Sequence, residues 1–167
     1  MSLRLKQQSL EPLRSLSGAE ALKGLEEVIP PISFHNEDTS YLLPKKRTIR
    51  TWLFAVAKEE GKAMGAVSYI FCSDDYLRSL NEQYLHATYF TDVITFDYCG
   101  ENTVSGDIFI SVDRVKENAK QYKQRYFQEM LRVMLHGLLH LCGHKDKTKK
   151  EAEKMREKEE YYLRKFV

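Results

Sequence analysis

The chain has 167 residues, of which 43% are hydrophobic and 30% are charged, and its formal net charge at pH 7 is +2. This composition is typical of a folded protein with one core, and it excludes a disordered chain, a membrane-spanning protein and a strongly basic polyanion binder. Residues 1–30 carry a weak helical rhythm and no evident chemistry. We therefore expect a separate N-terminal extension at 1–30, either mobile or an artefact of the expressed sequence, followed by a single domain at 31–167.

The periodicity of the apolar residues predicts strands and helices in mixed order. In chain order we expect a strand at 32–35, a helix at 45–62, a strand around 67–71, a helix after Ser73, a strand at 91–97, a loop at 98–106, a strand at 107–111, a helix capped by Asp113 with Val115, Ala119 and Tyr122 on its apolar face, a long helix at about 126–142 and an amphipathic helix at about 149–166. The long helix is apolar on most sides and is expected at the centre. Because strands and helices do not alternate regularly, the fold class is α+β, a small mixed β-sheet packed with helices.

The location signals favour the cytoplasm. No apolar run follows the first basic residues, as a secretory signal requires, and acidic residues in this region exclude a transit peptide. The three cysteines, Cys72, Cys99 and Cys142, are odd in number and widely spaced, which is typical of reduced thiols. Cys142 follows His140 by two residues and therefore points to another side of the helix, so we place it in the core.

The central helix carries the most informative pattern of the chain. His136 and His140 are four residues apart, so a helix places both imidazoles on one face. Gly143 can end the helix in a left-handed conformation, and Asp146 follows where a returning loop can present a third ligand. Two nitrogens and one oxygen leave a tetrahedral metal with one open position, which is the pattern of a catalytic site. The alternative is a buried, hydrogen-bonded histidine pair followed by a surface loop.

His144 competes with Asp146 for the third position, since imidazole is the commoner zinc ligand. A residue directly after a helix-ending glycine has little room to swing back, whereas a residue two further on has more, and this geometry favours Asp146. A carboxylate ligand leaves less positive charge on the metal than a third imidazole. We therefore expect a metal-bound water that is somewhat less acidic and a site more tolerant of harder ions.

Position 137 argues against one class of metalloenzyme. Helix-borne zinc peptidases carry a glutamate general base directly after the first histidine, and here that residue is Gly137. Either a metal-bound hydroxide works without this base or another residue supplies the function. A glycine also permits a close approach to the helix by another part of the chain or by the substrate.

Together with two upstream stretches, this pattern resembles the YbeY family of metal-dependent endoribonucleases. The family signature is close to His-Gly-x-Leu-His-Leu-x-Gly-x-Asp-His, and the resemblance covers about residues 31–166. The matching stretches are His136 to Gly143, Leu80-Asn81-x-x-Tyr84 with Thr91 to Phe96, and Gly106-Asp107-Ile108-x-Ile110-Ser111. Three motifs in one order are far more specific than the histidine pair alone.

The chain departs from the family pattern at several site positions. Asp146 stands where the family usually has the third histidine ligand, with His144 displaced nearby. Leu85 replaces an arginine thought to help catalysis, Thr88 stands at a commonly acidic position and Phe90 at a common proline. These are loop and site positions, so the resemblance still implies the family fold, a small mixed sheet with surrounding helices.

The resemblance implies a single-strand-specific endoribonuclease that acts in ribosomal RNA maturation, including the 3′ end of the small-subunit RNA, and in ribosome quality control. It also implies one metal ion, usually taken as zinc, and the ribosome and its assembly factors as partners. On this basis His136, His140 and Asp146 are the predicted metal ligands, and His136, His140 and Arg132 are the predicted catalytic residues, with Arg132 a candidate for phosphate contact.

The residues beside the site give a weaker, independent indication of RNA. Lysines crowd the region after the central helix, at Lys145, Lys147, Lys149 and Lys150. We predict that Lys145 and Lys147 bind substrate phosphates, which makes binding salt-dependent. The alternative is a solvated helix start balanced by neighbouring glutamates.

Other side chains near the motifs have two interpretations each. Tyr89, Phe90 and Tyr98 are able to stack on unpaired bases, although aromatic residues beside strands more often serve in packing. Asp92 either caps a turn or orients a ligand histidine, and Asp107 is similar.

Two rival functions remain open from the sequence. A zinc-dependent metallopeptidase has similar ligand spacing, but Gly137 speaks against it. A non-catalytic, ribosome-associated adaptor with a structural metal is the rival from another class. The function favoured by the sequence is a metal-dependent hydrolase of RNA phosphodiester bonds.

Overall fold

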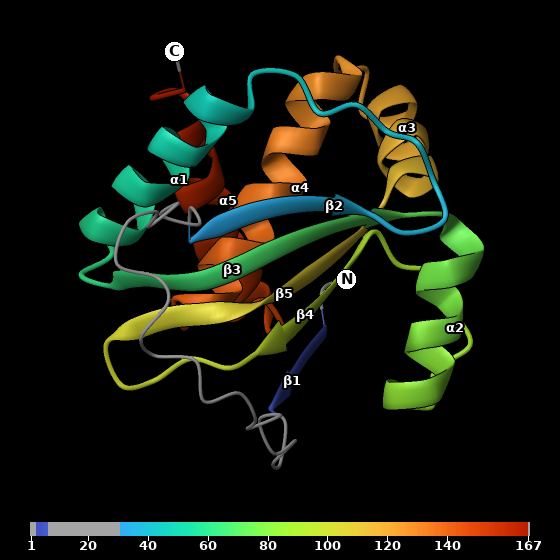
Figure 1. The fold of residues 1–167 in the computed structure, drawn as a ribbon, viewed down its shortest axis with the longest axis horizontal. Helices are drawn as coiled ribbons and strands as arrows, with labels where there is room; N and C mark the ends of the chain where they lie inside the picture. Colours follow the sequence, from blue (N-terminus) through green and yellow to red (C-terminus); the bar gives the residue numbers. More distant parts are fainter. Residues whose placement is uncertain (1–2, 7–30, 167) are drawn as a thin grey trace, which may run out of the picture.

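The protein is seen here as a computed structural model that describes residues 3–6 and 31–166. Residues 7–30, most of the predicted N-terminal extension, lie outside the described residues. In chain order the elements are β1 (Leu3–Lys6), β2 (Ile32–Asn36), α1 (Lys46–Glu59), β3 (Ala63–Cys72), α2 (Asp74–Leu85), β4 (Val93–Asp97), β5 (Thr103–Ser111), α3 (Val112–Gln121), α4 (Tyr126–Leu141) and α5 (Lys149–Leu163). The predicted fold class, a mixed sheet packed with helices, is confirmed (Figure 1).

The strands form one sheet in the order β1-β4-β5-β3-β2. β2, β3 and β5 run parallel to one another, β4 is antiparallel to β5, and β1 is parallel to β4. A short hairpin joins β4 to β5, whereas the parallel neighbours β2 and β3 are connected through α1, because parallel strands require a longer crossover. The segment with α2 connects β3 to β4, which lie on either side of β5. Among the described strands, the sheet is mixed because the β4–β5 hairpin is its one antiparallel pair and the other three pairs are parallel.

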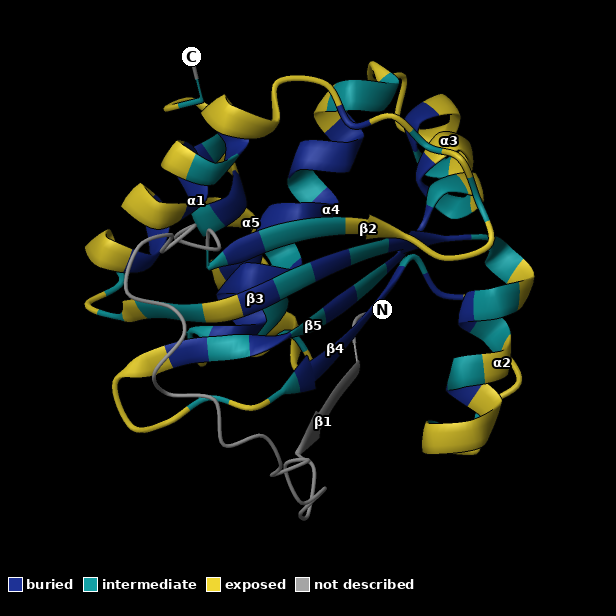
Figure 2. Ribbon diagram, in the orientation of Figure 1, coloured by how far each residue is buried: buried dark blue, intermediate teal, exposed yellow. Residues whose placement is uncertain are grey.

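The side chains of the sheet alternate between two cores. Val93, Ile108 and Ile110 belong to the large core that also contains the buried faces of α1, α4 and α5. Their neighbours Ile94 and Phe109 face the opposite side, where a smaller core forms under α2. Figure 1 shows α2 apart from the other helices, and Figure 2 shows α4 as the most continuously buried helix. No helix in the described part of the chain is long and apolar enough to span a bilayer.

The strand β1 was not predicted: it falls within the predicted extension but pairs in parallel with β4. Three further details differ from the sequence predictions. β5 begins at Thr103, inside the predicted loop, because residues Thr103 and Val104 pair with the early part of β3. β3 itself begins at Ala63 for the same reason. The cap of α3 is Ser111, whose hydroxyl accepts a hydrogen bond from the Arg114 amide.

Asp113, the predicted cap of α3, lies one residue inside the helix. Its carboxylate instead accepts a hydrogen bond from the backbone N–H of Asp74, at the start of α2. The residue therefore ties the beginnings of two helices together, and a tertiary contact replaces the local cap that the sequence suggested.

The central helix α4 lies against β4 and β5 and also contacts α1, α3 and α5. Gly137 is buried at the contact with the sheet, and a Cβ at this position would lie 2.7 Å from Cγ2 of Ile108 on β5. This distance is too short for two carbon atoms. The close approach expected at position 137 is thus made by the sheet, on the side of α4 that faces the large core.

We predict that Gly137→Ala lowers the free energy of unfolding by about 1–2 kcal/mol. Overpacking against Ile108 costs about 1–3 kcal/mol, and the better helix propensity of alanine offsets about 1 kcal/mol of it. Urea unfolding followed by circular dichroism measures the change. Gly100→Ala is the control, since no atom lies within 4 Å of its added Cβ, and it should stay within about 0.5 kcal/mol of the original protein. A more stable Gly137→Ala protein would contradict the packing argument.

Candidate metal centre

The two histidines of α4 face each other across one helical turn. Their ring centroids are 4.6 Å apart, and the Nε2 atoms of His136 and His140 are separated by 3.0 Å. His140 is buried, whereas the side chain of His136 retains 13% exposure. The i, i+4 spacing thus brings both imidazoles together with one of them accessible from outside.

The loop after α4 brings Asp146 to the same point. Gly143 has a φ of +107°, and the backbone amides of Gly143 and His144 donate to the carbonyls of His140 and Leu139, which turns the chain back along the helix. The Oδ2 atom of Asp146 then lies 3.3 Å from Nε2 of each histidine. One ligand atom from each of His136, His140 and Asp146 lies within 4.8 Å of the others.

The side chain of His144 points elsewhere. Its Nε2 lies 2.5 Å from Oε2 of Glu60, the residue that follows α1. Its backbone carbonyl accepts the hydrogen bond of His140 Nδ1 at 2.9 Å. Between the two candidates for the third ligand, the geometry therefore places Asp146 at the histidine pair, while His144 orients His140 through its main chain.

Glu60 accepts three hydrogen bonds that hold the loop after α4 in place. Besides His144, it accepts from Nζ of Lys158 at 2.7 Å and from the hydroxyl of Tyr162 at 2.5 Å. Burial alone would raise the pKa of Glu60. The hydrogen bonds from Lys158, Tyr162 and His144, in decreasing order of effect, outweigh burial and lower this pKa to about 2. The start of the returning loop is thereby attached to both α1 and α5.

Glu159 on α5 orients the other histidine. Its Oε1 atom lies 2.5 Å from Nδ1 of His136, and its side chain is buried. Nδ1 of each imidazole lies beside an acceptor, so in the neutral tautomer that donates through Nδ1 the two Nε2 atoms carry no proton and face each other and a carboxylate. Such an arrangement is repulsive unless a cation lies between the three groups.

The donor set and its spacing fit a divalent metal. Ligand atoms bound at about 2.0–2.2 Å to one tetrahedral ion lie roughly 3.3–3.6 Å from one another, close to the distances found here. A proton can also relieve the repulsion: burial lowers the pKa of His136, but hydrogen bonds to Asp146 and Glu159 raise it to about 9. Burial raises the pKa of Asp146, but hydrogen bonds with His136 and His140 outweigh it and hold this pKa well below its usual range.

The group lies at the wall of an open pocket of about 330 Å³. His136 and Asp146 line it together with Phe90, Arg114 and Arg132. Among the described residues, no fourth histidine, cysteine, aspartate or glutamate joins the three. Two nitrogens and one oxygen therefore meet beside solvent with one coordination position unfilled by protein, as in catalytic metal sites.

Cys142 takes no part in this group. It is partly buried and packs against the large core, and burial raises the pKa of its thiol to about 12. The thiol thus stays protonated at neutral pH and is a poor metal ligand.

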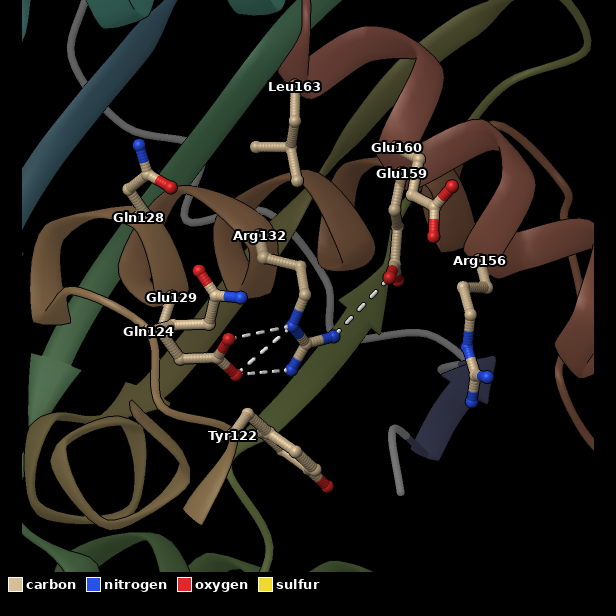
Figure 3. A pocket seen from close by; sticks show the side chains of 9 residues that line it. All are labelled: Tyr122, Gln124, Gln128, Glu129, Arg132, Arg156, Glu159, Glu160 and Leu163. Atoms are coloured by element: carbon tan, nitrogen blue, oxygen red, sulfur yellow. Dashed lines mark hydrogen bonds and ion pairs between the residues drawn. The ribbon is translucent and has the colours of Figure 1, made fainter. Parts of the chain in front are cut away.

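Arg132 lies one helical turn before His136 and is surrounded by carboxylates. Its guanidinium is 2.6 Å from Oε1 of Glu129 and 3.4 Å from Oε2 of Glu159 (Figure 3). It also lies 3.7 Å from Oδ2 of Asp92. Glu129 and Glu159 are buried, so their charges require this partner. These contacts place Arg132 beside Glu159, which in turn contacts His136. Arg132 also lines the metal pocket, so its predicted phosphate contact stays a prediction.

Asp92 contacts neither histidine. Its carboxylate accepts from Nδ2 of Asn118 at 3.1 Å, and its carbonyl accepts from the Ser111 amide. Asp92 therefore joins β4 to α3 and belongs to the carboxylate group around Arg132. Asp107 likewise lies away from the metal centre and accepts a hydrogen bond from the hydroxyl of Tyr98.

The sequence analysis missed Glu129, Glu159 and Glu60. Glu159 had a recognisable signal, because it falls between Met155 and Tyr162 on the apolar face of α5, where a glutamate is out of place. Glu60 had none, since its partners come from the far end of the chain.

Comparisons with known proteins show which family the chain belongs to. Residues 32–167 match the sequence model of the family described as Endoribonuclease YbeY. The chain belongs to the YbeY family. Proteins named Endoribonuclease YbeY from Cytophaga hutchinsonii and Flavobacterium johnsoniae are 50% and 44% identical to it, over 81% and 78% of this chain and 96% and 94% of theirs.

A YbeY relative from Porphyromonas gingivalis is 45% identical over 79% of this chain and 87% of its own length. Among solved structures, a solution structure of a Thermotoga maritima protein aligns with a TM-score of 0.58 and 29% identity, covering 81% of this chain and 88% of that one. The part of the chain that matches the YbeY family contains every residue of the metal centre.

We predict that Glu60→Gln lowers stability by about 1–3 kcal/mol at neutral pH, because charge-assisted hydrogen bonds are lost. A carboxyl whose folded pKa is lowered from 4.5 to about 2 stabilises the fold above pH 4.5 and loses this contribution as the pH falls toward 2. The stability difference between the original protein and Glu60→Gln should therefore shrink from pH 5 to pH 2. Urea unfolding at several pH values measures it.

The control for this pH series is Glu117→Gln, an exposed carboxyl on α3. Its stability should stay within about 0.5 kcal/mol of the original protein. A Glu60→Gln difference that is constant between pH 5 and pH 2 would contradict the assignment.

Proposed function

We infer that this chain is an endoribonuclease that acts in ribosomal RNA maturation. Membership of the YbeY family makes it a hydrolase of RNA phosphodiester bonds. The observation that carries the inference is the meeting of His136, His140 and Asp146 at an open pocket. Such a site can supply what phosphodiester hydrolysis requires, which is a metal ion that a water molecule and a phosphate can both reach.

The finer properties that we propose are those expected from the sequence. The substrate is single-stranded RNA, including the 3′ end of the small-subunit RNA, and the setting is the ribosome with its assembly factors and quality control. The compartment that we propose is the cytoplasm, since Cys72, Cys99 and Cys142 are free thiols.

The metal that we propose is one zinc ion per chain. Two imidazole nitrogens and one carboxylate oxygen are ligands that zinc accepts, and each imidazole has a second partner, as is typical of histidines that ligate metals. A carboxylate in place of a third imidazole makes the site more tolerant of harder divalent ions. Metal identity is thus set by availability as well as by the donor atoms.

The residues of the site have different roles in hydrolysis. His136, His140 and Asp146 would hold the ion, which when bound supplies positive charge to a phosphoryl oxygen and makes a water molecule more acidic. Glu159 and the carbonyl of His144 keep the two imidazoles in the tautomer that presents bare Nε2 atoms. Arg132 keeps Glu159 in place and balances its charge.

Lys145 and Lys147 flank Asp146 in the exposed loop. We propose that they contact RNA phosphates near the site, because no carboxylate within the described residues forms an ion pair with them. Their contribution depends on salt, as for any exposed cation that displaces counterions from a nucleic acid.

The two rival functions have no support. Position 137 has no room for the glutamate of a helix-borne zinc peptidase, because Gly137 faces Ile108 and the large core. A structural metal needs a closed ligand shell, whereas the three ligands here leave one position open beside a pocket.

We predict that His136→Ala and Asp146→Ala each reduce bound metal from about one ion per chain to a small fraction, and reduce cleavage of single-stranded RNA by at least about 100-fold. Removing one of three ligands leaves too few donors for a stable site. Elemental analysis and a gel assay of purified protein, free of other nucleases, measure both quantities.

His144→Ala is the matched control for the third ligand. It loses the contact with Glu60 but keeps the backbone carbonyl that orients His140, so it should retain bound metal. Loss of metal in His144→Ala with retention in Asp146→Ala would reverse the assignment.

We predict that Glu159→Gln weakens metal binding by about 10–100-fold, because His136 loses the partner that fixes its tautomer. Competition with a chromogenic chelator measures the affinity. Glu157→Gln, an exposed change two residues away on α5, serves as the control and should leave the affinity unchanged. Equal affinities in all three proteins would show that Glu159 does not orient the histidine.

A further inference from the structure

A second, larger groove adjoins the metal pocket. It has a volume of about 550 Å³ and lies between the start of α4, the end of α3 and the outer side of α5 (Figure 3). Tyr122 and Arg132 line both this groove and the metal pocket. A chain that occupies one cavity can therefore continue directly into the other.

Tyr122 stands at the junction of the two cavities. The sequence analysis placed it on the apolar face of α3, but 57% of it is exposed, whereas Val115 and Ala119 are buried. The helix ends at Gln121, so Tyr122 follows the last turn and leaves the apolar face. Its backbone N–H donates to the carbonyl of Asn118, which fixes the residue at the helix end. An exposed aromatic ring is thus held in place where the groove meets the metal pocket.

Three carboxylates, Glu129, Glu159 and Glu160, line the groove against two arginines, so its lining carries no excess of positive charge, and this selects the kind of ligand. The carboxylates of Glu129 and Glu159 are paired with Arg132. Gln124 and Gln128 contribute neutral amides with both donors and acceptors. A phosphate gains little in such a groove, whereas a flat, uncharged group with polar edges fits both the ring and the amides.

The outer rim has a different character. Arg156 is exposed on α5, and no carboxylate among the described residues forms an ion pair with it. Figure 3 shows its guanidinium directed away from the carboxylates around Arg132. A free cation at the rim suits the phosphate of a nucleotide whose base lies inside.

We propose that this groove binds one unpaired nucleobase of the RNA, from a nucleotide adjacent to the phosphate that is cleaved. Tyr122 stacks on the base, Gln124 and Gln128 contact its polar edge, and Arg156 faces its phosphate. The proposal rests on the proposed function and adds to it a subsite that explains a preference for single strands, since a paired base is not free to enter.

The test combines changes in the protein with changes in the RNA. A short single-stranded RNA with a mapped cleavage site is prepared intact and with the base removed at each position near that site. For the original protein, removal at one position should lower kcat/KM by about 5–100-fold, the usual worth of one stacked base. Tyr122→Ser should lower kcat/KM on intact RNA by a similar factor and lose little more when that base is absent.

Two further variants keep the test decisive. Tyr122→Phe preserves the ring and should behave like the original protein. Tyr161→Ser removes an exposed tyrosine on α5 that does not line the groove, and it should retain the full effect of base removal. Bound metal and the melting midpoint, measured for each protein, separate a loss of stacking from a loss of folding.

The outcomes distinguish this inference from the function on which it rests. If the original protein cleaves RNA but no single base matters by more than twofold, or if the effects of Tyr122→Ser and base removal simply multiply, the base subsite is wrong and the nuclease assignment stands. If the original protein cleaves no RNA with any metal, the proposed function fails, and the subsite with it.

Discussion

The site depends on one constraint: three ligand atoms are held close together although they repel one another unless a cation lies among them. Two imidazole nitrogens, from His136 and His140, and one oxygen of Asp146 lie 3.0–3.3 Å apart at the edge of the core. With both imidazoles neutral and donating through Nδ1, each of the three atoms is an acceptor, and the contact is unfavourable until a proton on His136 or a metal ion lies among them. Their neighbours hold them together, and a metal ion provides the attraction that the protein lacks.

The neighbours form two connections from the metal centre into the fold. One runs from His136 through Glu159 to Arg132, and so joins α4 to α5. The other runs from His140 through the backbone of His144 to Glu60, and so joins α4 to α1. Two of the helices that contact α4, α1 and α5, thus help to orient an imidazole. The position of the metal centre is therefore a property of the packed helices as well as of the motif.

The same packing explains why a buried arginine serves the site. Glu129 and Glu159 are carboxylates removed from water, and Arg132 lies between them. A lone buried carboxylate near the metal would attract the ion away from its ligands or take up a proton. With Arg132 in place, the negative charge that faces the metal is mainly that of Asp146. Because the carboxylates around Arg132 outnumber it, the adjoining groove favours an uncharged base over a phosphate.

The sequence by itself determined the elements other than β1, the fold class and the histidine pair of the proposed metal group, and it favoured Asp146 over His144 as the third member. Apolar periodicity is local, so it located the helices and strands, and the i, i+4 histidines with Gly143 and Asp146 form a motif within one turn and one loop. Only the tertiary structure decided the partners of that motif. Glu60 is 84 residues from His144, and Glu159 is 23 residues from His136, distances that no local pattern spans. The exposure of Tyr122 and the packing of Gly137 on β5 were likewise decided by how helices end and meet the sheet, because burial depends on which surfaces face each other in space.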